Sequence, residues 1–357
     1  MTHARLITPD GVREGAIHLA RGRIAAIRSR APRAARRIDV RGASVAPGFI
    51  DVHVWGDPEA LARRLPAEGT TAFVSTIGPE PSVRLLERVA QAPRLPDSGA
   101  RWLGWHLEGP WVNPQRAGAL PQRWMRAPAL GELARVVARA RGAVKLVTLA
   151  PERRGTASAV RWLHRRGIVV SLGHSIASEQ TAQRAIAAGA RAVTHVFNGM
   201  PLFHHRVPGL LGAALTDDRL TTMVIADGVH VSPSAFRLLA RAKGPERIVL
   251  VTDSIAAAPS GARRRGGAFY NRSGVLAGSC LTMVQAVRNA MRWGLVDLPT
   301  AARMASTNPA NLLGVGRRLG TLEVGKRADL VVLDRQAHVH MTLIDGRVAY
   351  KRGMGSD

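Results

Sequence analysis

The sequence predicts an α/β fold, a (β/α)8 TIM-type barrel with a small β-sandwich built from both termini. The chain of 357 residues is 46% hydrophobic and 21% charged, a globular composition at a length that suits one large domain and an appendage. Eight short runs rich in Val, Ile and Thr alternate with helical stretches, which is typical of parallel βα units. Short runs separated by glycine-containing turns occupy both ends of the chain. We therefore expect residues 1–45 and 317–357 to form the sandwich and residues 46–316 to form the barrel.

The expected elements follow one another in a regular order. The eight barrel strands are expected in the runs that begin at Ser44, Gly69, Arg101, Ala143, Gly167, Ala192, Thr221 and Arg247. Amphipathic helical stretches begin at Ser82 and Ala177. In the second of these, Ser178 is suited to be the N-cap and Gly189 to end the helix. The terminal strands are expected in the runs that begin at Ala4, Gly15, Ala35, Ala328, His338 and Arg347.

The charge of the chain is strongly basic. Lys and Arg total 51 against 25 Asp and Glu, for a net charge of +26, and only four of the 51 are lysine. An excess of positive charge of this size is typical of proteins that bind the phosphates of nucleic acids. The arginines are spread over the whole length, however, and aromatic residues are only 4% of the chain, too few for a base-stacking surface. We therefore expect a small anionic substrate and neither a nucleic-acid nor a membrane partner.

Cysteine usage and the first thirty residues indicate the cellular compartment of the protein. Cys280 is the only cysteine, so no disulfide can form within the chain. Charged residues interrupt the apolar positions of the first thirty residues, which argues against a signal peptide, and no run is long enough to span a membrane. The sequence predicts a cytoplasmic protein.

Polar residues gather at the ends of the expected barrel strands, where a parallel barrel places its active site. These residues are Asp51, His53, His106, Glu108, His174, His195, Asn198, Asp227, His230 and Asp253. Unpaired polar groups are costly to crowd together unless they bind something. The sequence thus predicts a binding or catalytic site at the mouth of the barrel.

Three of these residues form a set that suits a divalent metal ion. Glu108, His174 and His195 supply a carboxylate and two imidazoles from three different strands, which fits Zn²⁺ and leaves room for water. Asp253 follows the last strand. A water activated by a metal needs a nearby carboxylate to accept its proton and return it to a leaving group, and we expect Asp253 to do this.

Motifs along nearly the whole chain resemble the N-acetylglucosamine-6-phosphate deacetylase family of the amidohydrolase superfamily. They run in the order APGFIDVH, HLEGPWVNP, LAPE, SLGHS, THVFNGM, HHRVPG, IADGVHVSP, LVTDSIAAA, LAGSCLTM, NPANLLG and LEVGKRADLVVLD. The resemblance implies hydrolysis of N-acetylglucosamine 6-phosphate to glucosamine 6-phosphate and acetate. It also implies a metal-dependent barrel beside a β-sandwich made from both termini.

The resemblance assigns roles to individual residues. It implies that Glu108, His174 and His195 are metal ligands and that Asp253 is the catalytic acid and base. It implies that His230 polarises the amide carbonyl. Asn198 and Gly199 would hold the sugar. Arg206 would bind the phosphate by reaching in from a neighbouring subunit, which implies a homodimer.

The chain departs from the family pattern at the mouth. Where many relatives carry HxH on the first strand, this chain has His53 and Trp55, and an indole offers no lone pair to a metal. We therefore expect one divalent ion, zinc before iron, manganese or cobalt, with His53 as a supporting group or a weak additional ligand. Leu120 stands where the family has a substrate-contacting histidine, and the segment that follows Asp253 reads as a compact basic loop.

Two other functions remain open from the sequence. One is hydrolysis of a different N-acylated amino sugar or of a cyclic amide. Relatives that act on cyclic amides often carry a carboxylated lysine at the end of the fourth strand, whereas Lys145 lies at the beginning of that run. The other is a barrel that binds a sugar phosphate without catalysis. Acetate release distinguishes a deacetylase from such a binding protein, which would release none.

Overall fold

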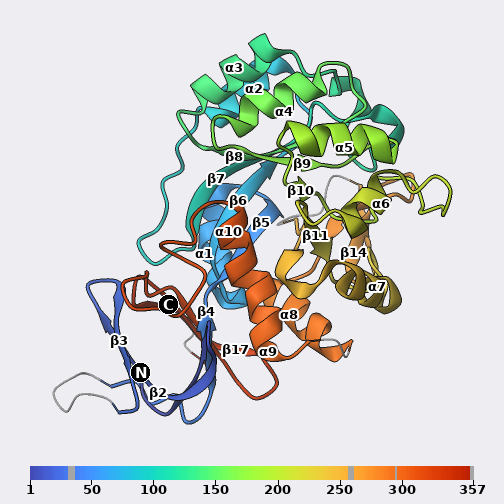
Figure 1. Cartoon of the computed structure of the whole chain (residues 1–357). Helices are drawn as coiled ribbons and strands as arrows, with labels where there is room; N and C mark the ends of the chain where they lie inside the picture. The colour runs from blue at the N-terminus through green and yellow to red at the C-terminus, as the bar shows by residue number, and fades with distance from the viewer. Residues whose placement is uncertain (31–36, 256–260, 294–295, 354–357) are drawn as a thin grey trace.

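The protein consists of a large barrel and a smaller β unit in which both ends of the chain lie (Figure 1). The computed structural model describes residues 1–30, 37–255, 261–293 and 296–353. Within this part of the chain, no helix is both long and apolar enough to cross a membrane. The cytoplasmic location stays a prediction.

Eight parallel strands form the barrel, in their order along the chain. They are β5 (Phe49–Trp55), β6 (Thr70–Ile77), β7 (Arg101–Glu108), β8 (Val144–Leu149), β9 (Val169–Leu172), β10 (Ala192–Val193), β11 (Thr221–Ile225) and β12 (Ile248–Val251). The ends of β5 and β12 meet through backbone hydrogen bonds: Asp253 N donates to His53 O over 2.9 Å, and Trp55 N donates to Ser254 O over 2.9 Å. The (β/α)8 prediction is confirmed. Strands such as β6 are buried along their entire length, as expected for strands covered on both faces.

All eight expected runs contain a barrel strand, with two differences in detail. The run from Ser44 is divided, because β4 (Ser44–Pro47) belongs to the terminal sheet and only β5 belongs to the barrel. The run from Ala192 is a strand for two residues only, and the chain then turns through residues 194–199. This early end of the strand leaves the segment that carries His195 outside the regular sheet.

Helices cover the outside of the barrel (Figure 1). The α-helices are α1 (Pro58–Arg64), α2 (Ser82–Val89), α3 (Leu130–Arg139), α4 (Thr156–His164), α5 (Glu179–Ala188), α6 (Gly209–Thr216), α7 (Pro233–Lys243), α8 (Met283–Arg292), α9 (Leu298–Ala302) and α10 (Asn308–Leu312). The 3-10 helices are η1 (Leu65–Glu68), η2 (Pro114–Arg116), η3 (Gln122–Trp124) and η4 (Pro245–Arg247), and η5 (Arg303–Thr307) is a π-helix. Helix α5 begins and ends as predicted. The Ser178 side chain accepts a hydrogen bond from Thr181 N, and Gly189, with φ of 120°, caps the other end.

Strands from both termini form a single seven-stranded sheet in the order β18, β17, β16, β4, β1, β2, β3. Its other members are β1 (Ala4–Thr8), β2 (Gly11–Ala20), β3 (Arg23–Arg28), β16 (Leu330–Leu333), β17 (Val339–Ile344) and β18 (Arg347–Lys351). β2 pairs with β1 through its first half and with β3 through its second half, and apolar side chains of β1, β2, β3, β4, β16 and β17 share one core. The prediction that both termini build one β unit is confirmed. The boundaries at residues 45 and 317 stay a prediction.

Two segments differ from what the sequence indicated. The run from Ala35 contributes only an isolated bridge between Thr2 and Asp39, while Ala35 and Arg36 lie outside the described residues. The basic segment after Asp253 is not a simple loop. It forms a three-stranded antiparallel sheet of β13 (Arg263–Arg265), β14 (Ala268–Tyr270) and β15 (Leu276–Ser279). Ser279 N donates to Asp253 O over 2.9 Å, so β15 lies against the end of β12.

Candidate active site and metal centre

The carboxyl ends of the barrel strands bring the predicted ligands together. Glu108 is the last residue of β7, His174 follows β9 by two residues, and His195 follows β10 by two residues. Oε1 of Glu108 lies 3.0 Å from Nε2 of His174 and 2.8 Å from Nε2 of His195. The two Nε2 atoms are 3.2 Å apart. All three side chains are buried. The structure therefore converges one carboxylate and two imidazoles on one point.

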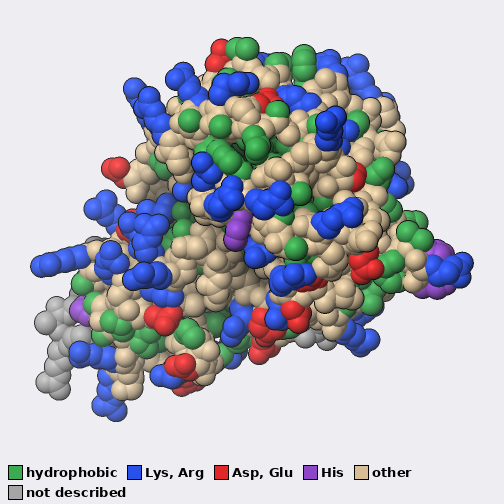
Figure 2. Space-filling view, turned by 45° about the horizontal axis from the view of Figure 1, so that its top comes forward, with side chains coloured by type: hydrophobic (Ala, Val, Ile, Leu, Met, Phe, Trp, Pro, Cys, Tyr) green, Lys and Arg blue, Asp and Glu red, His purple; other side chains and the backbone are tan. Residues whose placement is uncertain are grey.

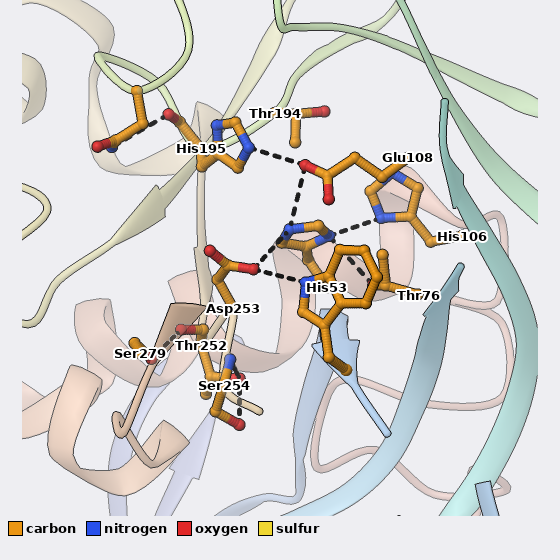
Figure 3. Close-up of polar contacts among 12 residues, drawn as sticks. His53, Thr76, His106, Glu108, Thr194, His195, Thr252, Asp253, Ser254 and Ser279 are labelled. Carbon is orange, nitrogen blue, oxygen red and sulfur yellow. Dashed lines mark hydrogen bonds and ion pairs between the residues drawn. The ribbon is translucent and has the colours of Figure 1, made fainter. Parts of the chain in front are cut away.

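His53 joins this cluster from β5. Its fully buried Nε2 lies 3.1 Å from Oδ1 of Asp253 and 3.6 Å from Oε1 of Glu108. His53, Glu108 and His195 together offer three ligand atoms within 4.8 Å of one another (Figure 3). Glu108 and His195 therefore belong to two overlapping sets of possible ligand atoms. His174 completes one set, and His53 completes the other.

The charges of the cluster shift its pKa values. Burial alone would lower the pKa of His53, but the carboxylates of Glu108 and Asp253 outweigh it and raise that pKa to about 9. Burial opposes ionisation of Glu108, yet His53 and the hydrogen bonds from His174 and His195 hold its pKa well below the usual range. For Asp253, burial is likewise outweighed, chiefly by His53, and the pKa is lowered. Both carboxylates are therefore ionised at neutral pH.

Three residues of the site have strained backbone conformations. The φ angles of His174, His195 and Asp253 are 46°, 28° and 49°, in the left-handed region that side chains with a Cβ rarely adopt. Such strain costs about 1–3 kcal/mol per residue and persists where the surrounding structure imposes it. In each case the chain leaves a barrel strand and turns sharply at the residue in question. The turn directs the side chain back over the mouth.

A layer of buried polar side chains lies beneath the cluster. Nδ1 of His53 is 2.8 Å from Nδ1 of His106, and Nε2 of His106 is 2.7 Å from Oγ1 of Thr148. Thr148 contacts Thr194 over 2.7 Å, and Thr194 contacts Ser171 over 2.6 Å. Sequence reasoning noted His106 at a strand end but gave it no role. In the sequence these polar residues stand singly among apolar ones. They become neighbours only when the barrel strands pair.

Two further hydrogen bonds orient ring nitrogens. Nδ1 of His174 donates to the backbone oxygen of Arg116 over 2.6 Å, which orients the ring so that Nε2 faces Glu108. Nδ1 of His230 lies 2.6 Å from Oδ2 of Asp227. Burial lowers the pKa of His230, but the hydrogen bond and charge of Asp227 outweigh it and raise that pKa. Asp227 was noted at a strand end without a role, and the structure shows it as the partner of His230.

The residues expected to bind substrate occupy different surroundings. The amide of Asn198 donates to the backbone oxygens of His195 and Val196 over 3.3 and 3.4 Å. A Cβ added at Gly199 would lie 3.0 Å from Nδ1 of His174, so this glycine lies against a candidate ligand. The hydrogen bonds of Arg206 among the described residues go only to His204 and His205 of its own loop.

The loop that carries Arg206 projects from the barrel. Residues 201–208 form the second part of the connection from β10 to α6 and extend outward in Figure 1. Figure 2 shows histidine and arginine side chains together on a projection at the same edge of the molecule. Leu202, Phe203 and Val207 on this loop are 90%, 53% and 64% exposed. Exposed apolar side chains of this size mark a surface suited to contact with another protein.

The two replaced family positions lie side by side. A Cβ added at Gly78 would be 2.9 Å from Cη2 of Trp55 and 3.5 Å from Cδ2 of Leu120. Both apolar side chains therefore border the same point of the backbone after β6. Trp55 also donates a hydrogen bond from Nε1 to Oδ1 of Asp253 over 2.8 Å. His53 and Trp55 lie two residues apart on β5, and this period-2 spacing is the sequence signal for a shared face.

The residues present fit a divalent metal ion. Imidazole nitrogens and a carboxylate oxygen are the donors that zinc and its neighbours in the first transition series prefer. Nε2 of His53 is buried against two carboxylates, yet it makes no hydrogen bond within the described residues. A buried imidazole nitrogen that lacks a hydrogen-bond partner beside two carboxylates fits a position next to a bound cation. Glu108, His174 and His195 would hold the ion, with His53 beside it.

The fold and the site define a (β/α)8-barrel hydrolase with histidines and carboxylates gathered at the ends of its barrel strands. Residues 44–349 match the model of the amidohydrolase family. The chain is 37% identical to an N-acetylgalactosamine-6-phosphate deacetylase of Escherichia coli O157:H7, over 98% of this chain and 100% of that protein. It is 33% identical to an N-acetylglucosamine-6-phosphate deacetylase of Bacillus subtilis (strain 168), over 95% of this chain and 93% of that protein.

Solved structures agree with this relationship. An N-acetyl-D-glucosamine-6-phosphate deacetylase mutant of Mycobacterium smegmatis, in complex with N-acetyl-D-glucosamine 6-phosphate, superposes with a TM-score of 0.89 at 34% identity, over 98% of each chain. The N-acetylglucosamine-6-phosphate deacetylase of Thermotoga maritima gives 0.87 at 30% identity, over 98% of this chain and 99% of that one. The chain belongs to the amidohydrolase family and, within it, to the N-acetylglucosamine-6-phosphate deacetylase family.

Proposed function

We propose that the chain hydrolyses the N-acetyl group of N-acetylglucosamine 6-phosphate, giving glucosamine 6-phosphate and acetate. The observation that carries this proposal is the convergence of Glu108, His174 and His195 on one point, with Asp253 beside His53. A carboxylate and imidazoles around one position, next to a second carboxylate that is ionised, are the parts that metal-assisted amide hydrolysis needs.

Each residue has a defined task in this reaction. A divalent ion held by Glu108, His174 and His195 would polarise the amide and make a water more acidic. Asp253 accepts a proton from the attacking water while the oxygen of that water adds to the carbonyl carbon of the acetyl group. Asp253 then returns the proton to the nitrogen as the carbon–nitrogen bond breaks.

His230 stabilises the oxygen that becomes negatively charged. Its Nδ1 faces the carboxylate of Asp227 at 2.6 Å, so the protonated ring keeps an N–H on Nε2 for the substrate. The raised pKa of His230 supports this protonated form. Donors placed where charge develops are among the largest contributions to catalysis.

Substrate binding is assigned to the loop after β10. Asn198 and Gly199 would hold the sugar, and Arg206 would bind the phosphate of a substrate in the neighbouring subunit of a homodimer. The projection of the 201–208 loop and its exposed Leu202 and Phe203 support this arrangement. An arginine fork matches the oxygens of a phosphate.

The presence of Trp55 in place of a potential ligand supports a single metal ion in the site. We expect this ion to be zinc. Iron, manganese and cobalt prefer similar donors and remain alternatives. Metal analysis of the purified protein, together with activity after chelation and reconstitution with each ion, identifies the ion and its stoichiometry.

Acetate release tests the proposed function. Purified protein is incubated with N-acetylglucosamine 6-phosphate and with unphosphorylated N-acetylglucosamine, and acetate and free amine are measured. We expect both products in equal amounts from the phosphorylated sugar. Asp253→Asn should lower kcat by about 10²–10⁴-fold, the range for a general acid and base, without loss of metal. No acetate from the wild-type chain at any metal loading would contradict the proposal and favour a binding protein.

N-acetylgalactosamine 6-phosphate is a second candidate substrate. The observation in its favour is the 37% identity over 98% of the chain to an N-acetylgalactosamine-6-phosphate deacetylase. The two sugars differ only in the configuration of one hydroxyl. Comparison of kcat/KM for both substrates decides between them.

A further inference from the structure

Trp55 contacts the carboxylate that the proposed reaction uses. Its indole Nε1 donates a hydrogen bond of 2.8 Å to Oδ1 of Asp253. Nε2 of His53 lies 3.1 Å from the same oxygen. No hydrogen bond ends on Oδ2 of Asp253 in the part of the chain that the structure describes, and Figure 3 shows this second oxygen without a dashed contact. The two oxygens of one carboxylate therefore have different surroundings.

The barrel closure fixes the two backbones that carry this contact. Asp253 N donates to His53 O, and Trp55 N donates to Ser254 O, each over 2.9 Å. Trp55 also forms a parallel bridge with Ile255. The relative position of Trp55 and Asp253 thus depends on strands β5 and β12 and not on a mobile side chain.

Packing fixes the indole ring itself. The edge of the ring lies over Gly78, where an added Cβ would meet Cη2 of Trp55 at 2.9 Å and Cζ3 at 3.3 Å. Leu120 borders the same point at 3.5 Å. A ring held on these sides keeps its N–H directed at Asp253.

We propose that Trp55 is a positioning residue for Asp253 and that it sets which carboxylate oxygen of Asp253 accepts and returns the proton. This inference rests on the proposed hydrolysis. The indole N–H and His53 hold Oδ1, which prevents rotation of the carboxylate and leaves Oδ2 for proton exchange with water and amine. The residue that replaces an expected imidazole in this chain thereby takes part in the reaction through Asp253. Small misplacements of a catalytic group are costly, because reacting atoms must be held in near-attack geometry.

Trp55→Phe tests this inference, because it removes the N–H and keeps an aromatic ring. We expect kcat for acetate release to fall by about 10- to 100-fold, the range for loss of a hydrogen bond to a charged group, with KM and metal content unchanged. In crystals of this variant, the Asp253 carboxylate should adopt more than one orientation. Wild-type kcat together with an unchanged Asp253 orientation would overturn the inference. A fall that appears as raised KM or lost metal would overturn it too.

Trp102→Phe is the matched control. Its indole N–H is buried and has no hydrogen-bond partner in the described residues, so the same substitution removes no hydrogen bond there. If Trp55→Phe fails to fold, β-(3-benzothienyl)alanine at position 55 keeps the shape of the indole and lacks its N–H, and the same fall in kcat is expected. A wild-type chain that releases no acetate contradicts the proposed function, whereas an active wild type with an equally active Trp55→Phe contradicts only this inference.

Gly78→Ala gives a second, independent variant. Its methyl group would press on the Trp55 ring without altering Trp55 or Asp253. We expect a smaller fall in kcat than for Trp55→Phe. In the Trp55→Phe background, Gly78→Ala should have no further effect on kcat, because the shorter ring lacks the atoms that the methyl group meets. Full additivity of the two substitutions would contradict a role that acts through the indole.

Discussion

Oε1 of Glu108 lies 2.8 Å from Nε2 of His195, although 87 residues separate them in the sequence. The same oxygen lies 3.0 Å from Nε2 of His174. The barrel brings these groups together because β7, β9 and β10 end at the same rim. A single carboxylate oxygen is thus the common neighbour of both imidazoles.

Glu108→Gln should remove the metal and the activity together. The amide keeps the size of the side chain but loses the negative charge that a cation requires. We expect metal affinity to fall by more than the roughly 10- to 100-fold that loss of an outer-shell partner costs. Metal content and kcat are measured after dialysis. Glu87→Gln, at an exposed position of α2, is the control and should change neither quantity. A Glu108→Gln protein with full metal would show that the ion binds elsewhere.

Gly199→Ala should displace His174. The added Cβ would lie 3.0 Å from Nδ1 of His174, at a residue with φ of 64°. Gly118→Ala is matched to it, because Gly118 has φ of 58° and faces the same ring at 3.8 Å, an ordinary contact. Both variants carry left-handed strain of about 1–2 kcal/mol, visible as a lower Tm. Only Gly199→Ala should also weaken metal binding. Equal metal affinity in the two variants would count against His174 as a ligand.

Asp227→Asn should move the alkaline limb of the pH profile of kcat to lower pH. Asp227 raises the pKa of His230, which acts in its protonated form. Activity is therefore full below that pKa and is lost as the pH rises through it. Without the carboxylate charge the pKa of His230 falls, so the loss begins at lower pH. Rate measurements across the alkaline range check this. An unchanged alkaline limb would mean that another group controls it.

Mixed dimers test whether Arg206 acts in the neighbouring subunit. Arg206→Ala should raise KM for the phosphorylated sugar, and Asp253→Asn should lower kcat by about 10²–10⁴-fold. If Arg206 reaches across, a dimer of one Arg206→Ala chain and one Asp253→Asn chain contains one site with both native residues. We expect coexpressed, differently tagged chains to regain activity as mixed dimers. No recovery in verified mixed dimers would place Arg206 in its own chain's site or outside any site.

The sequence alone was sufficient for the barrel and for the residues at its mouth. Most of the barrel strands are short runs rich in β-branched residues, and in a parallel barrel a residue such as Glu108 at a strand end must lie at the rim. The position of Glu108 next to His174 and His195 therefore followed from topology. The division of the run from Ser44 into two strands could not be predicted in this way, because β4 pairs with β16, nearly 300 residues later.

Contacts that depend on side-chain direction were not predictable. Trp55 was identified only as a poor metal ligand, whereas the structure directs its N–H at Asp253. That contact requires the β5 to β12 closure and the packing on Gly78. The layer of His106 and Thr148 likewise depends on which strands are neighbours in space.

The central claim is that Glu108, His174 and His195 hold one cation beside Asp253. X-ray diffraction from metal-loaded crystals, collected on both sides of the absorption edge of the bound metal, locates that ion directly. We predict one anomalous peak per chain at about 2.0–2.2 Å from Nε2 of His174, Nε2 of His195 and a carboxylate oxygen of Glu108. No peak among these three side chains, or a peak that none of them contacts, would contradict the account.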